Sequence, residues 1–191
     1  LVPLVRVGEN NANLIKRVMD AGAYGVIVPN VNNALDAKAA VDAVKYPPNG
    51  TRGVGLYRAQ GYGKIFEQYL QWLKEESVVI IQIEHIDAVR NIDEILSVPG
   101  IDAFIIGPYD LSGSMGKPGK FDDEEVQKAV DLVLQAGKKY NIPAGFHSVS
   151  SDPQNALKYK NKGFKFLGFS LDSIFLGDMV IEAMDVLRKT S

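Results

Sequence analysis

The chain has 191 residues, of which 46% are hydrophobic and 23% charged, proportions typical of one soluble globular domain with a sizeable core. The formal net charge of −2 argues against nucleic-acid binding, and no apolar run approaches the roughly 20 residues that span a bilayer. Without cysteine, disulfides, thiol nucleophiles and thiolate metal sites are excluded. We therefore expect a soluble, cytoplasmic protein whose partners include neither nucleic acid nor membrane.

Short apolar runs alternate with segments of helical spacing along the whole chain. The expected strands are 4–7, 24–29, 78–84, 101–106, 142–147 and 164–170. The expected helices lie near 11–22, 33–47, 66–73, 89–96, 126–133, 153–160 and 174–187. Two glycine-bearing segments, 49–63 and 111–120, are expected to be loops.

These elements form about six β-then-α units with no linker between them, a pattern that predicts an α/β fold with a parallel sheet. No glycine-rich dinucleotide fingerprint follows the first strand, so a (β/α)₈ TIM barrel is favoured over a nucleotide-binding sheet. Such a barrel needs eight units and roughly 250 residues. We therefore expect 1–191 to form a single incomplete TIM-barrel domain, with about the last six units in this chain and the first ones preceding Leu1 in the natural protein.

Two acids follow the central pair of expected strands. Glu84 ends the run 78–84, with Gln82 on the same strand face, and Asp110 follows the run 101–106. Because the carboxyl ends of parallel strands meet at one edge of a sheet, we expect both carboxylates to lie together there. Each acid alone would suit the N-terminus of the next helix. The pair favours a site for a hard divalent cation, which accepts carboxylate oxygens and keeps positions for water and substrate.

Other polar residues are candidates at the same edge. Arg6 ends the first strand and could form a surface ion pair or hold a carboxylate or enolate oxygen. His85 follows Glu84 and should point to the opposite face, packed between sheet and helix. His147 closes its strand at the functional edge and is the better candidate for proton transfer, although a lone histidine is more often structural.

Several segments together resemble the HpcH/HpaI aldolases, class II pyruvate aldolases of the phosphoenolpyruvate/pyruvate barrel superfamily. The most specific are Tyr-Pro-Pro-Asn-Gly-Thr-Arg-Gly-Val-Gly at 46–55, Gln-Ile-Glu at 82–84 and Ile-Gly-Pro-Tyr-Asp-Leu-Ser at 106–112. Further matches occur, in the family's order, at 5–7, 15–23, 28–31, 58–59, 91–95 and 113–116. The resemblance implies a modified barrel that begins here at its third strand.

The resemblance also implies an activity and the residues that carry it. It implies a lyase that cleaves a 4-hydroxy-2-oxo acid to pyruvate and an aldehyde with Mg²⁺ or Mn²⁺, in a homo-oligomer such as a hexamer. Glu84 and Asp110 match the metal ligands, and Gln82 lines the same site. The other matches are Arg6, which binds the 2-oxo acid, Asp20, a further active-site aspartate, and Gly107 and Pro108, around the pyruvate moiety.

One part of the family pattern is absent from these 191 residues. The family's acid–base histidine lies in an Asp-x-x-His-Gly-like segment after the second strand, and nothing here matches it. Tyr109, where many members have alanine, and the segment 145–147 indicate a different branch of the family. Two alternatives remain at this point: a lyase of the citramalyl- or malyl-CoA type on the same metal site, and a non-catalytic barrel that binds a 2-oxo acid.

Overall fold

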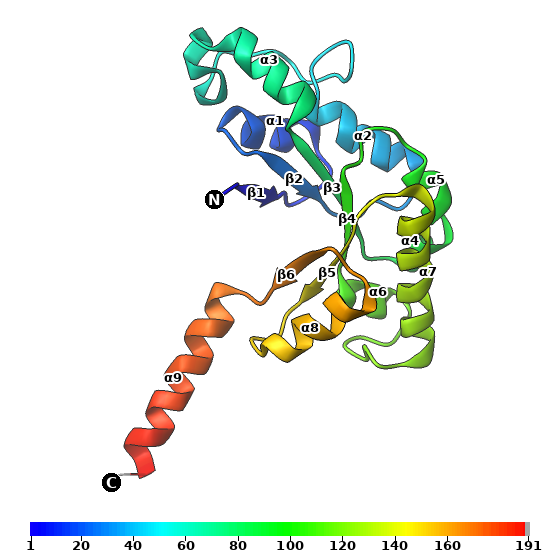
Figure 1. Ribbon diagram of the computed structural model, residues 1–191, viewed down its shortest axis with the longest axis vertical. Coiled ribbons are helices and arrows are strands. Elements are labelled where there is room, and N and C mark those ends of the chain that lie inside the picture. The colour runs from blue at the N-terminus through cyan, green and yellow to red at the C-terminus, as the bar shows by residue number, and fades with distance from the viewer. Residues whose placement is uncertain (190–191) are drawn as a thin grey trace.

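The computed structural model describes residues 1–189 and contains one curled sheet of six parallel strands (Figure 1). The strands pair in chain order, each with the next, which is the arrangement of successive units around a barrel. The strands are β1 (Leu4–Arg6), β2 (Gly25–Val28), β3 (Val78–Ile83), β4 (Ala103–Ile106), β5 (Ala144–Ser148) and β6 (Phe166–Phe169). The six units of a TIM barrel expected from the sequence are confirmed.

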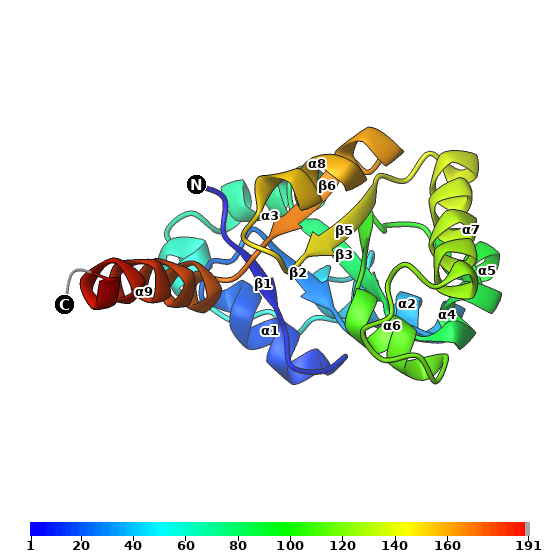
Figure 2. The ribbon, with the colours of Figure 1, turned by 90° about the horizontal axis from the view of Figure 1, so that it is seen from below.

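Helices between the strands cover the outer face of the sheet, and a last helix follows β6 (Figures 1 and 2). They are α1 (Ala12–Asp20), α2 (Ala34–Val44), α3 (Phe66–Glu75), α4 (Ile86–Arg90), α5 (Ile92–Leu96), α6 (Pro108–Ser114), α7 (Glu124–Tyr140), α8 (Pro153–Lys162) and α9 (Asp172–Lys189), with a 3₁₀ turn η1 at Arg58–Gly63. None of the helices within 1–189 is both long and apolar enough to cross a membrane.

The two faces of the sheet carry different clusters of buried side chains. Alternate residues of the central strands, such as Ile81, Ile83 and Phe104, pack outward into the main hydrophobic core beneath the helices. Ile80, Ala103 and Ile105 form a smaller cluster on the inner face. Any polar residue in register with the inner cluster therefore also faces the inside of the curled sheet.

Two local expectations were wrong. The segment after β4 was expected to be a loop, but Gly107 is the N-cap of α6 and Pro108 occupies its first turn. Proline at that position favours a helix because its fixed φ suits the first turn and its missing N–H has no helical partner there. The expected single helix at 89–96 is divided at Asn91 into α4 and α5.

The last helix, α9, projects away from the rest of the molecule in both views (Figures 1 and 2). None of its residues is buried, and large apolar side chains such as Leu176, Met179 and Ile181 are at least 63% exposed. It meets the body of the molecule near its start, where Phe175 contacts Phe169 and Asp178 accepts a hydrogen bond from Ser151. An exposed helix with this much apolar surface is a candidate for contact with another protein surface.

Candidate active site

Polar side chains gather on the inner face of the sheet at the carboxyl ends of the strands. Arg6 is the last residue of β1 and pairs with Ile27, which packs on the inner cluster. Gln82 pairs with Ile105 of that cluster, and Glu84 lies two residues further along the same face. The strand register therefore brings together Arg6, Gln82 and Glu84, which are far apart in sequence.

A chain of hydrogen bonds links these three side chains. Arg6 Nε donates to Gln82 Oε1 at 3.4 Å, and Gln82 Nε2 donates to Glu84 Oε2 at 2.5 Å. Arg6 is exposed, whereas Glu84 is only 3% exposed, so the chain leads from solvent to a buried carboxylate. Gln82 thereby orients both the guanidinium and the carboxylate.

The second oxygen of Glu84 is held by the backbone that follows β2. The N–H of Asn30 donates to Glu84 Oε1 at 2.9 Å, and Asn30 has a left-handed backbone with φ of 54°. Asparagine is one of the few non-glycine residues that adopt this conformation readily. Asn30 was not among the residues expected at this site, although an asparagine directly after a strand is a recognisable signal for such a turn.

Asp110 lies in the first turn of α6, close to the Glu84 carboxylate. Burial raises the pKa of Glu84 above its ordinary value; the Asn30 N–H and Arg6 oppose this, and the Asp110 carboxylate adds to it. Neither acid is a helix N-cap, since His85 caps α4 and Gly107 precedes α6. Neither acid therefore caps a helix, although Asp110 does lie at a helix N-terminus, and the two acids do meet at one edge as expected.

Gly107 provides the space in which this arrangement fits. A Cβ on Gly107 would lie 2.6 Å from Gln82 Nε2 and 3.0 Å from Glu84 Oε2, both closer than ordinary contact. Any larger residue would therefore displace the hydrogen-bonded pair. Pro108, the next residue, is buried and begins α6.

The donor set fits a hard divalent cation. Two carboxylates adjoin each other, and burial disfavours the charge on Glu84, so a cation between them would relieve an electrostatic cost. No group of three or more histidine, cysteine or acidic residues suited to a metal occurs among residues 1–189. Two carboxylates nevertheless suffice for Mg²⁺, which commonly keeps several waters and takes further oxygens from its substrate.

Asp20 is not brought to this site within the chain. It is the last residue of α1, is buried, and forms an ion pair with Lys16. With Lys16 it lines a separate pocket of about 600 Å³ that also includes Tyr57 and Arg58. A catalytic role for Asp20 stays a prediction.

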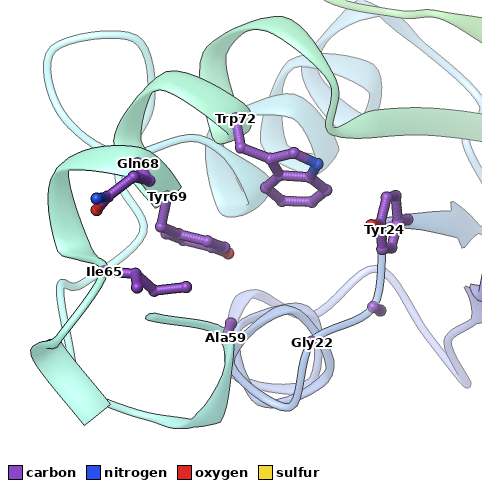
Figure 3. A pocket seen from close by; sticks show the side chains of 8 residues that line it. Gly22, Tyr24, Ala59, Ile65, Gln68, Tyr69 and Trp72 are labelled. Carbon is purple, nitrogen blue, oxygen red and sulfur yellow. The ribbon is translucent and has the colours of Figure 1, made fainter. Parts of the chain in front are cut away.

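Another pocket, of about 290 Å³, is lined mainly by aromatic and aliphatic side chains, which Figure 3 shows from close by. Tyr24, which directly precedes β2, meets Trp72 edge-on at 5.1 Å, and Tyr69 stacks on Trp72 at 5.3 Å. The pocket has no carboxylate in its lining and lies at the amino end of β2, whereas Glu84 follows the carboxyl end of β3. This aromatic pocket is therefore separate from the carboxylate site.

The two histidines differ from each other in position. His85 was expected to pack between sheet and helix, which was wrong: β3 ends at Ile83, and His85 caps α4 with Nδ1 accepting from the Asp87 N–H at 3.2 Å. The alternation of a strand no longer applies once the strand has ended. His147 lies on β5 and is half-buried.

Substitution of Asn30 tests whether its backbone geometry holds Glu84. Asn30→Val should lower the free energy of unfolding by about 1–2 kcal/mol, because a β-branched residue is disfavoured at positive φ. Asn30→Gly should be close to wild type, since glycine adopts this backbone freely. Chemical denaturation measures both. An equal loss in Asn30→Gly would show that the side chain, and not the backbone conformation, matters.

The raised pKa of Glu84 predicts a pH-dependent difference between wild type and Glu84→Gln in the presence of a chelator. The folded-state pKa is above the unfolded value, so Glu84 contributes most to stability at low pH and loses that contribution as pH rises through the folded-state pKa. Glutamine does not titrate. The stability of Glu84→Gln relative to wild type should therefore increase from about pH 4 to about pH 7. Denaturation at several pH values checks this, and a difference independent of pH would contradict it.

Comparison with known proteins agrees with this fold. A sequence profile described as HpcH/HpaI aldolase/citrate lyase matches residues 1–176. The chain is 36% identical over 187 residues to the 2-dehydro-3,6-dideoxy-6-sulfogluconate aldolase of Pseudomonas putida, covering 97% of this chain and 72% of that protein. It is 34% identical over 189 residues to the 2-keto-3-deoxy-L-rhamnonate aldolase of Escherichia coli K12, covering 97% of this chain and 69% of that protein.

Among solved structures, a HpcH/HpaI aldolase/citrate lyase family protein from Burkholderia cenocepacia J2315 superposes with a TM-score of 0.91 at 32% identity. The superposition covers 98% of this chain and 74% of that one. The match thus extends over nearly all the strands and helices described above. The chain belongs to the HpcH/HpaI aldolase/citrate lyase family and is a lyase.

Proposed function

We propose that the protein cleaves a 4-hydroxy-2-oxo acid, such as a 2-dehydro-3-deoxy sugar acid, to pyruvate and an aldehyde in a reaction that requires Mg²⁺ or Mn²⁺. The observation that carries the proposal is the paired carboxylates of Glu84 and Asp110 beside the hydrogen-bonded Arg6 and Gln82. The two relatives named above act on acids of this class, which supports the choice of substrate.

Each residue has a defined role in this proposal. Glu84 and Asp110 would hold the cation, which supplies Lewis-acid polarisation of the 2-oxo and carboxylate oxygens. Arg6 would donate to the oxygen on which negative charge develops, and Gln82 would keep that guanidinium in place through the 3.4 Å hydrogen bond. Gly107 and Pro108 would leave room for the pyruvate moiety beside Glu84.

The chemistry balances as a retro-aldol cleavage. A base takes the proton of the 4-hydroxyl, the C3–C4 bond breaks, and its electron pair passes to C3 as the enolate of pyruvate forms. C4 leaves as the aldehyde, and protonation at C3 then gives pyruvate. The resemblance implies that the base is the histidine of the Asp-x-x-His-Gly-like segment, which these 191 residues do not contain.

The test is an assay of pyruvate release coupled to lactate dehydrogenase. Chelator-treated protein should release no pyruvate from 2-dehydro-3-deoxy sugar acids, and added Mg²⁺ or Mn²⁺ should restore release. The thioester alternative is tested by supplying citramalyl-CoA or malyl-CoA instead and measuring the formation of acetyl-CoA. Cleavage of the thioesters without cleavage of the free acids would overturn the proposal.

We also propose that the protein is a homo-oligomer, with the hexamer implied by the resemblance as the expected state. The exposed apolar side chains of α9 support this, because an isolated chain would leave Leu176, Met179 and Ile181 in water. The cytoplasmic location expected from the sequence and the single domain over 1–191 likewise stay predictions.

A charge introduced on α9 tests the oligomer. Met179→Lys combined with Ile181→Glu should reduce the mass measured by light scattering towards that of the single chain, 20.9 kDa for these residues. Burial of a charge in an apolar interface is costly, so association should weaken strongly. Glu182→Gln, on the same helix, is the control and should keep the wild-type mass. An unchanged mass in the double variant would contradict a role for α9 in assembly.

A further inference from the structure

His147 lies in the same transverse row of the sheet as Glu84. Ile83 pairs with Ile106, and Ile106 pairs with Phe146, so the next residues along the three strands are Glu84, Gly107 and His147. His147 in turn pairs with Gly168. Residues in one row of a parallel sheet point to the same face, so Glu84 and His147 both face the inside.

A glycine separates Glu84 and His147 in this row of the sheet. Two strand spacings separate their backbones by roughly 10 Å, and the residue between them, Gly107, has no side chain. His147 also lines a pocket of about 400 Å³ together with Pro108 and Tyr109, the two residues that precede Asp110. The histidine therefore lies beside the segment that leads into Asp110.

The structure fixes the His147 ring from the side of β6. A Cβ on Gly168 would lie 2.9 Å from His147 Cδ2, so the ring lies directly against this glycine. His147 Nε2 lies 3.3 Å from the carbonyl oxygen of Ser170, a residue whose φ of 55° is left-handed. Ser170 is buried and is itself held by its hydroxyl, which donates to the Val149 carbonyl at 3.0 Å.

This geometry determines which ring nitrogen is available. A carbonyl oxygen only accepts, so Nε2 must carry the proton in the hydrogen bond to Ser170. In a neutral ring Nδ1 is then an acceptor, and it lies on the ring edge opposite the Cδ2–Nε2 edge that faces β6. Asn30 and Ser170 are thus alike: each is a left-handed residue after a strand whose backbone holds one inner-face side chain, Glu84 or His147.

We infer that His147 is a specificity-determining residue whose Nδ1 accepts a hydrogen bond from a hydroxyl of the substrate half that leaves as the aldehyde. This inference rests on the proposed aldol cleavage. The polar part of the pocket fits a polyhydroxylated chain, because it supplies hydroxyl, amide and carboxylate groups from Ser148, Ser150, Ser151, Asn155 and Asp178. Apolar side chains such as Phe121 and Ile174 complete the lining. The pyruvate half would lie at the cation site of Glu84 and Asp110, and His147 would contact the other half.

Two substrates distinguish recognition of a hydroxyl beyond C4 from a role that His147 would have with every substrate. On a 2-dehydro-3-deoxy sugar acid with hydroxyls beyond C4, His147→Leu should lower kcat/KM at least about tenfold, because a substrate hydroxyl loses its partner. On 4-hydroxy-2-oxopentanoate, which has only a methyl group beyond C4, the change should be less than about twofold. His147→Asn, whose amide oxygen can accept, should recover part of the loss.

A binding measurement makes the test independent of turnover. The protein has two histidines, so His85→Asn, which keeps a good N-cap, assigns the His147 ring resonances by NMR and serves as the matched control. A six-carbon aldonate, which has the hydroxyls but no 2-oxo group to cleave, should shift the His147 resonances, and pyruvate alone should not.

Three results would overturn the inference: equal loss on both acids in His147→Leu, no loss on either, or His147 resonances that the aldonate leaves unchanged. Equal loss would assign His147 to a step common to both substrates, such as proton transfer at the 4-hydroxyl. If wild type released no pyruvate from either acid, the proposed reaction would fail, while the NMR titration would still decide whether His147 contacts a hydroxylated ligand.

Discussion

Glu84→Gln should lower metal-dependent pyruvate release by at least about a hundredfold, because the substitution removes a negatively charged oxygen from the proposed cation site. The fold should persist, since glutamine has the same shape and its carbonyl can still accept from the Asn30 N–H. Raising the Mg²⁺ concentration should recover little activity. Steady-state kinetics over a range of metal concentrations measures the loss.

A carboxylate elsewhere on the surface provides the matched control for this variant. Glu124, at the start of α7, is 83% exposed at its side chain and pairs only at the surface with Lys128. Glu124→Gln should therefore retain wild-type kinetics and metal dependence. Full activity in Glu84→Gln, with the control also active, would contradict a role for the carboxylate pair in the reaction.

Gly107→Ala should produce the second large effect, a loss of about 10- to 100-fold in metal affinity and activity. The backbone of Gly107 has φ of −94°, which any residue can adopt, so the substitution causes no backbone strain. Its effect is steric, because the new Cβ would lie 2.6 Å from Gln82 Nε2 and 3.1 Å from Glu84 Cβ. The Gln82 amide and the Glu84 side chain must therefore move apart.

Stability should change little in Gly107→Ala, since the atoms displaced include the flexible end of Gln82. We expect a change of about 1 kcal/mol or less in the free energy of unfolding. Gly113→Ala, in the same helix and with no atom within 4 Å of the added Cβ, is the control and should keep full activity. A Gly107→Ala protein that binds metal as wild type does would show that the close packing of Gln82 and Glu84 is not needed.

The central strands of the sheet were predictable from sequence because they are largely buried on both faces. The run 103–106 is apolar without interruption, and the run 78–83 is apolar except for Gln82. Helices on one side of the sheet and an inner cluster on the other explain this pattern. The strand ends were also predictable to within a few residues. Once the strands were known to be parallel, the meeting of Glu84 and Asp110 followed from topology alone.

The parts that sequence did not predict depend on backbone conformation and on register. The left-handed backbones of Asn30 and Ser170 are tertiary features, since each supports a side chain more than 20 residues distant. Placing His147 in one row with Glu84 required the pairing of three strands, which spacing within a single segment does not specify. The error at α6 had a local cause, because the helix-starting role of Pro108 was overlooked.

Binding of Mn²⁺ followed by electron paramagnetic resonance tests the central claim most directly, because it observes the cation itself without any turnover. Chelator-treated wild-type protein should bind Mn²⁺, and pyruvate should alter the spectrum of the bound ion as its oxygens replace water. Both Glu84→Gln and Asp110→Asn should lose this binding, while Glu124→Gln should keep it. Equal binding of Mn²⁺ by wild type and by both site variants would contradict a cation site at Glu84 and Asp110.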